Sequence, residues 1–155
     1  MEKLIQIKPF YLAGISIRTT NKNGQAGSDL TSLWSRFYEE SIPMKISNPI
    51  GEEVYAVYTR YSSDYQGDYT AFIGLKIMDN EDLPKGLERI QIGGGKYREY
   101  IVKGDPGKSI PEAWKRIWEN DDNLKRRYTS DFEVYGEKSG NGPLSEVKIY
   151  LAINE

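Results

Sequence analysis

The chain of 155 residues contains no cysteine and no histidine. Without cysteine it cannot form a disulfide, use a thiol nucleophile or bind a metal through thiolates. Without histidine it cannot use Ser–His catalysis or bind a metal through imidazole. Any catalysis would have to use carboxylate, lysine, tyrosine or backbone groups. We therefore expect neither a metal site nor a cofactor.

An excess of charge of one sign and long apolar runs are also missing. Lys and Arg number 21 and Asp and Glu number 23, a net charge of −2, which gives no electrostatic footprint for nucleic acid or an anionic membrane. No apolar run approaches the ~18 residues of a transmembrane helix. The first residues, MEKLIQIKPF, lack the apolar segment and cleavage site of a signal peptide. These absences predict a cytoplasmic protein that binds neither nucleic acid directly nor a membrane.

Tyrosine, by contrast, is abundant, with 12 copies beside three Trp and four Phe. Its ring has apolar faces and a polar tip, which suits half-buried strand positions and aromatic-lined pockets alike. The apolar content of 38% and the charged content of 28% fit a globular protein. The length fits one domain with a sizeable core.

Two segments have the i, i+3, i+4, i+7 spacing of apolar residues that is typical of an amphipathic helix. They are 28–41 (SDLTSLWSRFYEES) and 109–120 (SIPEAWKRIWEN). Ser28 or Asp29 is the expected N-cap of the first helix. Ser109 with Glu112 predicts a capping box for the second, which would place Pro111 in its first turn.

The same order of elements is written twice along the chain. Trp114 and Arg116 each lie 80 residues after Trp34 and Arg36. In each half one strand-like segment precedes the helix and two follow it. These segments are 7–20, 52–61 and 69–77 in the first half and 87–104, 131–137 and 145–153 in the second. Each half therefore has the order strand–helix–strand–strand.

The repeat predicts an α+β fold built from tandem duplicated strand–helix–strand–strand modules, with antiparallel sheet and two main helices. We expect a single domain over 1–155, with module one at about 1–80 and module two at about 87–155. On the last strand of each module, alternate apolar residues predict a buried face. These residues are Ala71, Ile73, Leu75, Ile77, Val147, Ile149, Leu151 and Ile153. A cleft where the modules meet is a natural ligand site.

Two short motifs invite a binding interpretation that their context does not support. GGGKY at 93–97 precedes strand-like residues, whereas a phosphate-binding glycine loop leads into a helix. A bend or bulge in a strand is the better interpretation. KRR at 125–127 is too short for a nucleic-acid patch, and we expect it to be a solvated turn.

The segment YTSDFEVYGE, 128–137, places a glutamate within a strand. Because side chains alternate along a strand, Glu133 and Tyr135 share one face while Phe132 and Val134 share the other. The residues alone allow Glu133 to be a solvated carboxylate, a partner of a neighbouring arginine, or an anion in a pocket. Glutamate is rarely buried unpaired, which favours the first two.

Four stretches together resemble the GyrI-like effector-binding domains of AraC-type regulators, in particular their integron-cassette, cationic drug-binding branch. The stretches are VYAVYTRYSSDYQGDYTAFIGLKI, AWKRIW, RRYTSDFEVYGE and SEVKIYLAI. The resemblance implies the tandem fold and the binding of small cationic or aromatic molecules, including varied drugs, in a groove between the modules. It also implies that Glu133 recognises the cation and that Glu146 is a second site carboxylate.

In regulators of this superfamily the domain is fused to a DNA-binding helix-turn-helix, for which this chain has no residues left. The resemblance therefore implies a free-standing sensor or sequestering protein. A transcription regulator is a candidate partner, and we expect a monomer or a homodimer.

Aromatic residues near Glu133 complete the expected ligand site. Tyr135 shares its face, and Tyr55 shares a face with Glu53 in the similar stretch Glu53–Tyr55. The remaining expected lining residues are Trp118, Tyr97, Phe72 and Tyr69. Trp34, Phe37, Trp114 and Ile117 lie on the helix stripes, so we predict core packing for them.

Three functions remain open from the sequence. The favoured one is a binding protein for cationic, amphipathic or aromatic small molecules, with Glu133 as counter-ion. The alternative is a small-molecule hydrolase that uses Glu133 as general base, since an apolar pocket raises the pKa of a carboxyl group. The third is a protein-interaction role, such as inhibition of a topoisomerase. Whether the protein is an enzyme stays open, with binding preferred.

Overall fold

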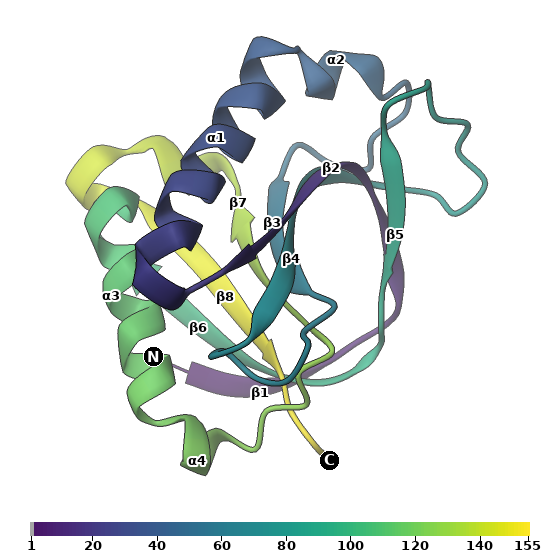
Figure 1. Cartoon of the computed structure of the whole chain (residues 1–155). Helices are drawn as coiled ribbons and strands as arrows, with labels where there is room; N and C mark the ends of the chain where they lie inside the picture. Colours follow the sequence, from purple (N-terminus) through teal and green to yellow (C-terminus); the bar gives the residue numbers. More distant parts are fainter. Residues whose placement is uncertain (1) are drawn as a thin grey trace.

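The computed structural model describes residues 2–155, and within them eight strands form one antiparallel sheet (Figure 1). The strands are β1 (Glu2–Ile7), β2 (Phe10–Thr20), β3 (Val54–Thr59), β4 (Asp68–Ile77), β5 (Glu88–Ile92), β6 (Gly95–Lys103), β7 (Ser130–Tyr135) and β8 (Glu146–Ala152). Their spatial order is β1-β6-β8-β7-β3-β4-β2-β5. Strands β2, β3 and β4 of the first half are neighbours, as are β6, β7 and β8 of the second. The β3–β7 pair joins the halves.

The described chain also contains four α-helices. They are α1 (Gln25–Glu39), α2 (Ile42–Lys45), α3 (Pro106–Glu119) and α4 (Asp121–Leu124). Helices α1 and α3 lie side by side on one face of the sheet (Figure 1). The predicted α+β fold with two main helices on antiparallel sheet is therefore confirmed.

The core on the helix-covered face follows the predicted alternation. All eight residues expected on the buried face of β4 and at the C-terminal strand are at most 6% exposed. Leu33 and Phe37 of α1 pack on β4, and Ile110 and Ile117 of α3 pack on β8. Each such side chain contributes about 1.5–3 kcal/mol relative to an exposed one, so these contacts fix both helices on the sheet.

The sheet curls on the side opposite the helices and encloses a second hydrophobic core there. Strand β1 leads into β2 through Lys8 and Pro9, and β5 leads into β6 through Gly93 and Gly94. Yet β1 and β6 lie at one end of the strand order, and β2 and β5 lie at the other. A two-residue link spans only about 10 Å, so the two ends of the sheet must approach each other. The sheet therefore bends away from the helices into a concave face.

The glycine segment lies at this bend, as the sequence analysis expected. A Cβ atom on Gly94 would come within 2.7 Å of Cδ of Pro9, so a larger residue would not fit beside the neighbouring strand. Gly95 has φ of 130°, a conformation that other residues rarely adopt. These glycines let the link between β5 and β6 pass close beside the link between β1 and β2.

Both main helices begin earlier than predicted. Helix α3 starts at Pro106, with Asp105 as N-cap accepting a hydrogen bond from the Gly107 amide at 3.2 Å. The predicted capping box at Ser109 and the first-turn position of Pro111 are therefore wrong, because both residues lie inside the helix.

In the first helix the predicted caps are also wrong. Helix α1 starts at Gln25 after Gly24 in the left-handed conformation, so Ser28 and Asp29 lie inside it. The buried Ala26 extends the apolar stripe one turn toward the N-terminus, and its small size hid that turn from the pattern.

We predict that Gly74→Ala destabilises the fold. Gly74 of β4 faces Gly14 of β2, and a Cβ atom on Gly74 would lie 2.2 Å from the carbonyl oxygen of Ala13. Relieving that overlap costs about 1–3 kcal/mol, measurable by urea denaturation. Gly93→Ala is the control, because its Cβ atom would meet nothing within 4 Å. Equal stability of the two variants would contradict the close approach of β2 and β4.

Candidate ligand-binding site

A pocket of about 220 Å³ lies between α1 and α3, above strands β3, β4 and β7. Helix α1 contributes Ala26, Gly27 and Leu30, and α3 contributes Ile110, Pro111, Trp114 and Trp118. The strands contribute Tyr58, Tyr69 and Glu133, and the remaining lining residues are Asn21, Tyr61, Tyr65 and Arg126. The wall is thus largely aromatic and aliphatic, with one carboxylate in it.

Glu133 is only 1% exposed, and its carboxylate is held by hydrogen bonds. Tyr135 donates to Oε1 at 2.5 Å, while Tyr58 and Trp114 donate to Oε2 at 2.8 and 2.6 Å. The β3–β7 register explains this arrangement, since Glu133 lies opposite the small Ala56. Tyr58 lies two residues further along the same face of β3, and α3 supplies Trp114.

The charge of Glu133 has no basic partner within 4.0 Å among residues 2–155. Arg126 lines the same pocket, but it pairs with Asp131 at 2.7 Å and with Asp121 at 3.2 Å. Burial raises the pKa of Glu133 above the ordinary value of 4.5, and the hydrogen bonds from Tyr135, Tyr58 and Trp114 partly oppose that rise. Within residues 2–155 the site thus contains a buried carboxyl group with three hydrogen-bond donors and no basic side chain paired with it.

The predicted solvated turn at 125–127 is wrong in its central residue. Arg126 is 7% exposed and Asp131 is 0% exposed, so their ion pair is buried. Tyr61 also donates to Asp131 at 2.6 Å, and the amide of Ala152 donates at 2.9 Å. A buried charge is tolerated only when it is paired and hydrogen-bonded in this way. Arg126 is therefore part of the structure beneath the pocket rather than a free cation.

Aromatic rings line the pocket in both perpendicular and parallel pairs. The ring of Tyr58 meets that of Trp114 at 85° with 5.3 Å between centroids, and that of Tyr69 at 83° with 5.9 Å. Tyr65 and Trp118 are parallel, at 7° and 5.9 Å. This arrangement presents both ring faces and ring edges to the pocket.

The structure brings together four of the eight expected site residues. Glu133, Tyr69 and Trp118 line the pocket, and Tyr135 contacts the carboxylate. Tyr55 and Glu146 line a separate groove on the concave face. Phe72 and Tyr97 are fully buried in the core of that face.

The separation of Tyr55 from Glu133 follows from the strand register. Val54 pairs with Tyr135 and Ala56 pairs with Glu133, so the even-numbered residues of β3 face the helices. Tyr55 and Glu53 point to the concave face instead. The sequence analysis aligned Glu53 and Tyr55 with Glu133 and Tyr135. That alignment is wrong in phase, because Glu53 and Tyr55 face the concave side of the sheet and Glu133 and Tyr135 face the helices.

Sequence reasoning missed four aromatic residues of the pocket, namely Tyr58, Tyr61, Tyr65 and Trp114. Trp114 packs in the core under α3, as predicted, and also donates to Glu133. One available signal was its indole N–H, which needs an acceptor when buried. Tyr61 and Tyr65 lie in the connection between β3 and β4. A connection has no regular alternation of side chains, so the sequence does not indicate where these two side chains point. Phe37 and Ile117 are buried as predicted, and Trp34 is half-buried.

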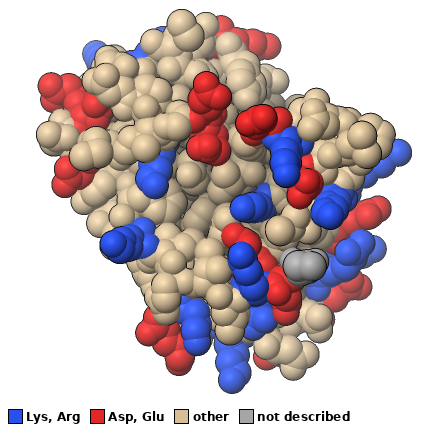
Figure 2. Space-filling view, turned by 180° about the vertical axis from the view of Figure 1, so that it is seen from behind, with Lys and Arg blue, Asp and Glu red and all other residues tan. Residues whose placement is uncertain are grey.

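Basic and acidic side chains are interspersed over the molecular face seen in Figure 2, so that face presents no field of a single sign. Within residues 2–155 no helix is long and apolar enough to cross a membrane. The same residues contain no group of three side chains that could hold a metal ion.

The tandem fold and the pocket between its two main helices define the class, an effector-binding domain of the GyrI-like kind. Residues 3–153 match the family of integron-associated effector binding proteins (Cass2), and the chain belongs to that family. The resemblance noted from the sequence is thereby confirmed.

Relatives of known name or structure cover nearly the whole chain. YobU of Bacillus subtilis (strain 168), named as a candidate transcriptional regulator, is 27% identical over 146 residues, which are 92% of this chain and 91% of YobU. The integron cassette protein VCH_CASS2 from the mobile metagenome of Vibrio cholerae has a TM-score of 0.79 at 24% identity, over 99% of this chain and 95% of that one. The protein SAV2435, solved bound to tetraphenylphosphonium, has a TM-score of 0.79 at 16% identity, over 99% and 94%. At these identities the structures establish the fold alone.

The raised pKa of Glu133 predicts how stability depends on pH. Between the ordinary value of 4.5 and the raised one, the folded state binds more protons than the unfolded state. The free energy of unfolding of the wild type should therefore fall as pH rises through that window. A Glu133→Gln variant should lack this dependence, and each unit of pKa difference corresponds to about 1.4 kcal/mol.

Urea denaturation of both proteins, from about pH 4 to about pH 8, provides the test. Parallel stability curves, or a wild type that gains stability relative to the variant as pH rises, would contradict a raised pKa for this carboxyl group.

Proposed function

We propose that this protein binds small aromatic or amphipathic cations in the pocket between α1 and α3, with Glu133 as their counter-ion. The observation that carries the proposal is the environment of Glu133. Its carboxylate is 1% exposed, lies in an aromatic wall and has no basic partner within 4.0 Å among the described residues.

The physical argument concerns desolvation. A cation that leaves water loses hydration, and a carboxylate already held in a low-dielectric pocket offsets that loss far better than a surface carboxylate. Each aromatic face that the cation meets adds about 0.5–2 kcal/mol. Tyr58, Trp114 and Tyr135 hold the carboxylate in place before the ligand arrives. Positive charge and aromatic surface, rather than one particular ligand structure, are what this site selects.

Two comparisons support this ligand class. The family to which the chain belongs is described as effector-binding. SAV2435, which shares the fold, was solved with a lipophilic aromatic cation, tetraphenylphosphonium. The pocket volume of about 220 Å³ is below the roughly 300–1,000 Å³ of drug-sized sites. We therefore expect a bulky cation to place part of its structure beside Glu133 and to displace Tyr65 or Trp118.

The hydrolase alternative has weaker support from the geometry. Both carboxylate oxygens of Glu133 already accept hydrogen bonds from Tyr135, Tyr58 and Trp114. A general base would need a free oxygen directed at a water molecule. The arrangement suits a fixed counter-ion better.

We predict that tetraphenylphosphonium quenches tryptophan fluorescence with saturation, and that Glu133→Gln weakens its binding about 10- to 100-fold. The affinity of the wild type should fall as pH falls through the raised pKa of Glu133, because protonation removes the counter-ion. Glu39→Gln, on the exposed end of α1, is the control and should bind as the wild type does. Equal affinity of Glu133→Gln and wild type would overturn the counter-ion assignment.

We also predict that Gly27→Leu blocks the pocket. Gly27 lines it from α1, and a Cβ atom there would meet nothing within 4 Å, so a leucine side chain has room to occupy the ligand space. Binding should weaken about tenfold or more without loss of stability. Gly27→Ala is the control, expected to retain binding and to stabilise the helix by about 0.5–1 kcal/mol. Full binding by Gly27→Leu would show that the ligand lies elsewhere.

A further inference from the structure

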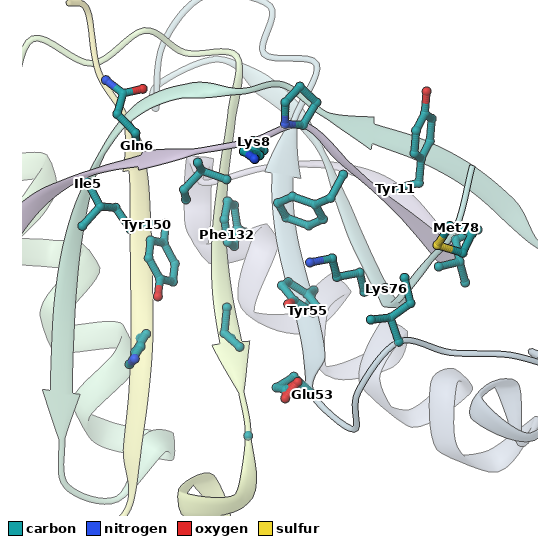
Figure 3. A pocket seen from close by; sticks show the side chains of 18 of the residues that line it. Ile5, Gln6, Lys8, Tyr11, Glu53, Tyr55, Lys76, Met78, Phe132 and Tyr150 are labelled. Carbon is teal, nitrogen blue, oxygen red and sulfur yellow. The ribbon is translucent and has the colours of Figure 1, made fainter. Parts of the chain in front are cut away.

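The concave face of the sheet contains a second and larger cavity that the proposed function does not use. It is an open groove of about 980 Å³ beside the bend that links β1 to β2 (Figure 3). Strands β1, β2, β3, β4, β7 and β8 contribute residues to its lining. Its size lies in the range of small-molecule sites, roughly 300–1,000 Å³.

The floor of this groove is aromatic. Phe132 stacks on Tyr150 with 4.9 Å between centroids and meets Phe10 edge-on at 5.6 Å. Tyr55 lies 5.6 Å from Phe10 and 6.0 Å from Phe132. All four rings line the groove; Phe132 is only 2% exposed, whereas Phe10, Tyr55 and Tyr150 are half-buried. A flat apolar molecule laid on them would cover a continuous aromatic surface.

Lysine side chains surround this floor. Lys76 is half-buried, with its amine 5.1 Å from the centroid of the Phe10 ring. Figure 3 shows Lys76 beside Tyr55 among the aromatic rings, and Lys8 at the edge of the groove on the link between β1 and β2. Lys148 also lines the groove. Within residues 2–155, these three lysines have no carboxylate within 4.0 Å, so their charges are free to meet a ligand.

Acidic groups in the groove restrict where an anion can lie. Lys138 and Glu146 pair at 3.6 Å and offset each other. Asp79 and Glu137 are exposed on connecting segments, where water screens them. Glu53 remains, beside Tyr55. Burial and the charge of Glu53 raise the pKa of Tyr55, whose hydroxyl therefore stays protonated as a donor.

We infer that this groove is a second ligand site, which takes flat aromatic anions such as aromatic carboxylates or sulfonates. The rings of the ligand stack on the half-buried rings of Tyr55 and Tyr150, and its anionic group lies toward Lys8 and Lys76, away from Glu53. The site is separate from the pocket at Glu133. Tyr55 and Val134 face the groove, whereas their chain neighbours Ala56 and Glu133 face the helices.

The test uses 8-anilinonaphthalene-1-sulfonate, a fluorescent aromatic sulfonate, titrated into the full chain. Lys76→Gln should weaken its binding about tenfold, the value of one charge-assisted contact. Glu53→Gln should strengthen binding, because it removes a like charge near the ligand. Lys85→Gln, an exposed lysine outside the groove, is the control and should leave binding unchanged. Thermal melts of each variant confirm that it is folded.

Glu133→Gln separates the two sites. Retained sulfonate binding in this variant, together with the opposite effects of Lys76→Gln and Glu53→Gln, supports the second site, whether or not a cation binds the first. Unchanged binding in Lys76→Gln, weaker binding in Glu53→Gln, or loss of sulfonate binding in Glu133→Gln would each overturn it.

Discussion

The antiparallel pairing of β3 with β7 is the constraint on which the rest of this structure depends. It joins the two four-stranded halves of the sheet at its centre, while at the edges β1 pairs with β6 and β5 pairs with β2, so each half of the sheet also contains a strand from the other half of the chain. Its register sets Glu133 opposite Ala56, whose small side chain leaves room for a carboxylate and for the ring of Tyr58. A shift of one residue would send Glu133 to the concave face and Phe132 under the helices. Apolar packing on both faces fixes the register, and this packing holds the carboxylate in a buried position that is unfavourable for a carboxylate alone.

The helices complete what the pairing begins. A buried carboxylate without donors costs several kcal/mol, and here Trp114 of α3 joins Tyr58 and Tyr135 to satisfy it. The donors come from three different elements, so the anionic site exists only when both halves are assembled. Beneath it, the buried pair of Arg126 and Asp131 connects the segment before β7 to the same strand. Positive charge is thus held close to the pocket without neutralising Glu133.

Because the sheet is curled, its central strands contribute side chains to two different sites, the pocket under the helices and the groove on the concave face. Glycine and proline links force the edges together, so the face opposite the helices becomes concave and keeps an open aromatic floor. Alternation along a strand then places unlike groups on the two sides. Glu133 faces the helices, while its neighbour Val134 and the cross-strand residue Lys148 face the groove. The paired strands β7 and β8 therefore present a carboxyl group on one side of the sheet and an amine on the other.

Much of the fold could be predicted from the sequence. The helix stripes and the alternation in β4 and β8 are local periodicities that reflect burial directly, and both were found in the structure. The helix starts at Gln25 and Pro106 were missed because their first turns contain small or polar residues that add little to the pattern. For the site, Glu133 was identified through resemblance rather than through periodicity. Tyr69 and Trp118 line the same pocket as Glu133, whereas Tyr55, Phe72, Tyr97 and Glu146 lie on the other face of the sheet.

The amino-acid sequence by itself determined the two main helices, most of the strands around them, and which residues of each strand share a face. It did not predict β1 as a strand, nor the division of the segment 87–104 into β5 and β6. It also excluded chemistry based on thiol and imidazole groups, because the chain contains neither. Only the tertiary structure decided which of the two faces of each strand lies under the helices, and therefore which aromatic residues meet Glu133. The physical reason is that alternation defines faces only relative to one strand. The common reference for all strands comes from pairings such as Ala56 with Glu133, which join residues far apart in the chain.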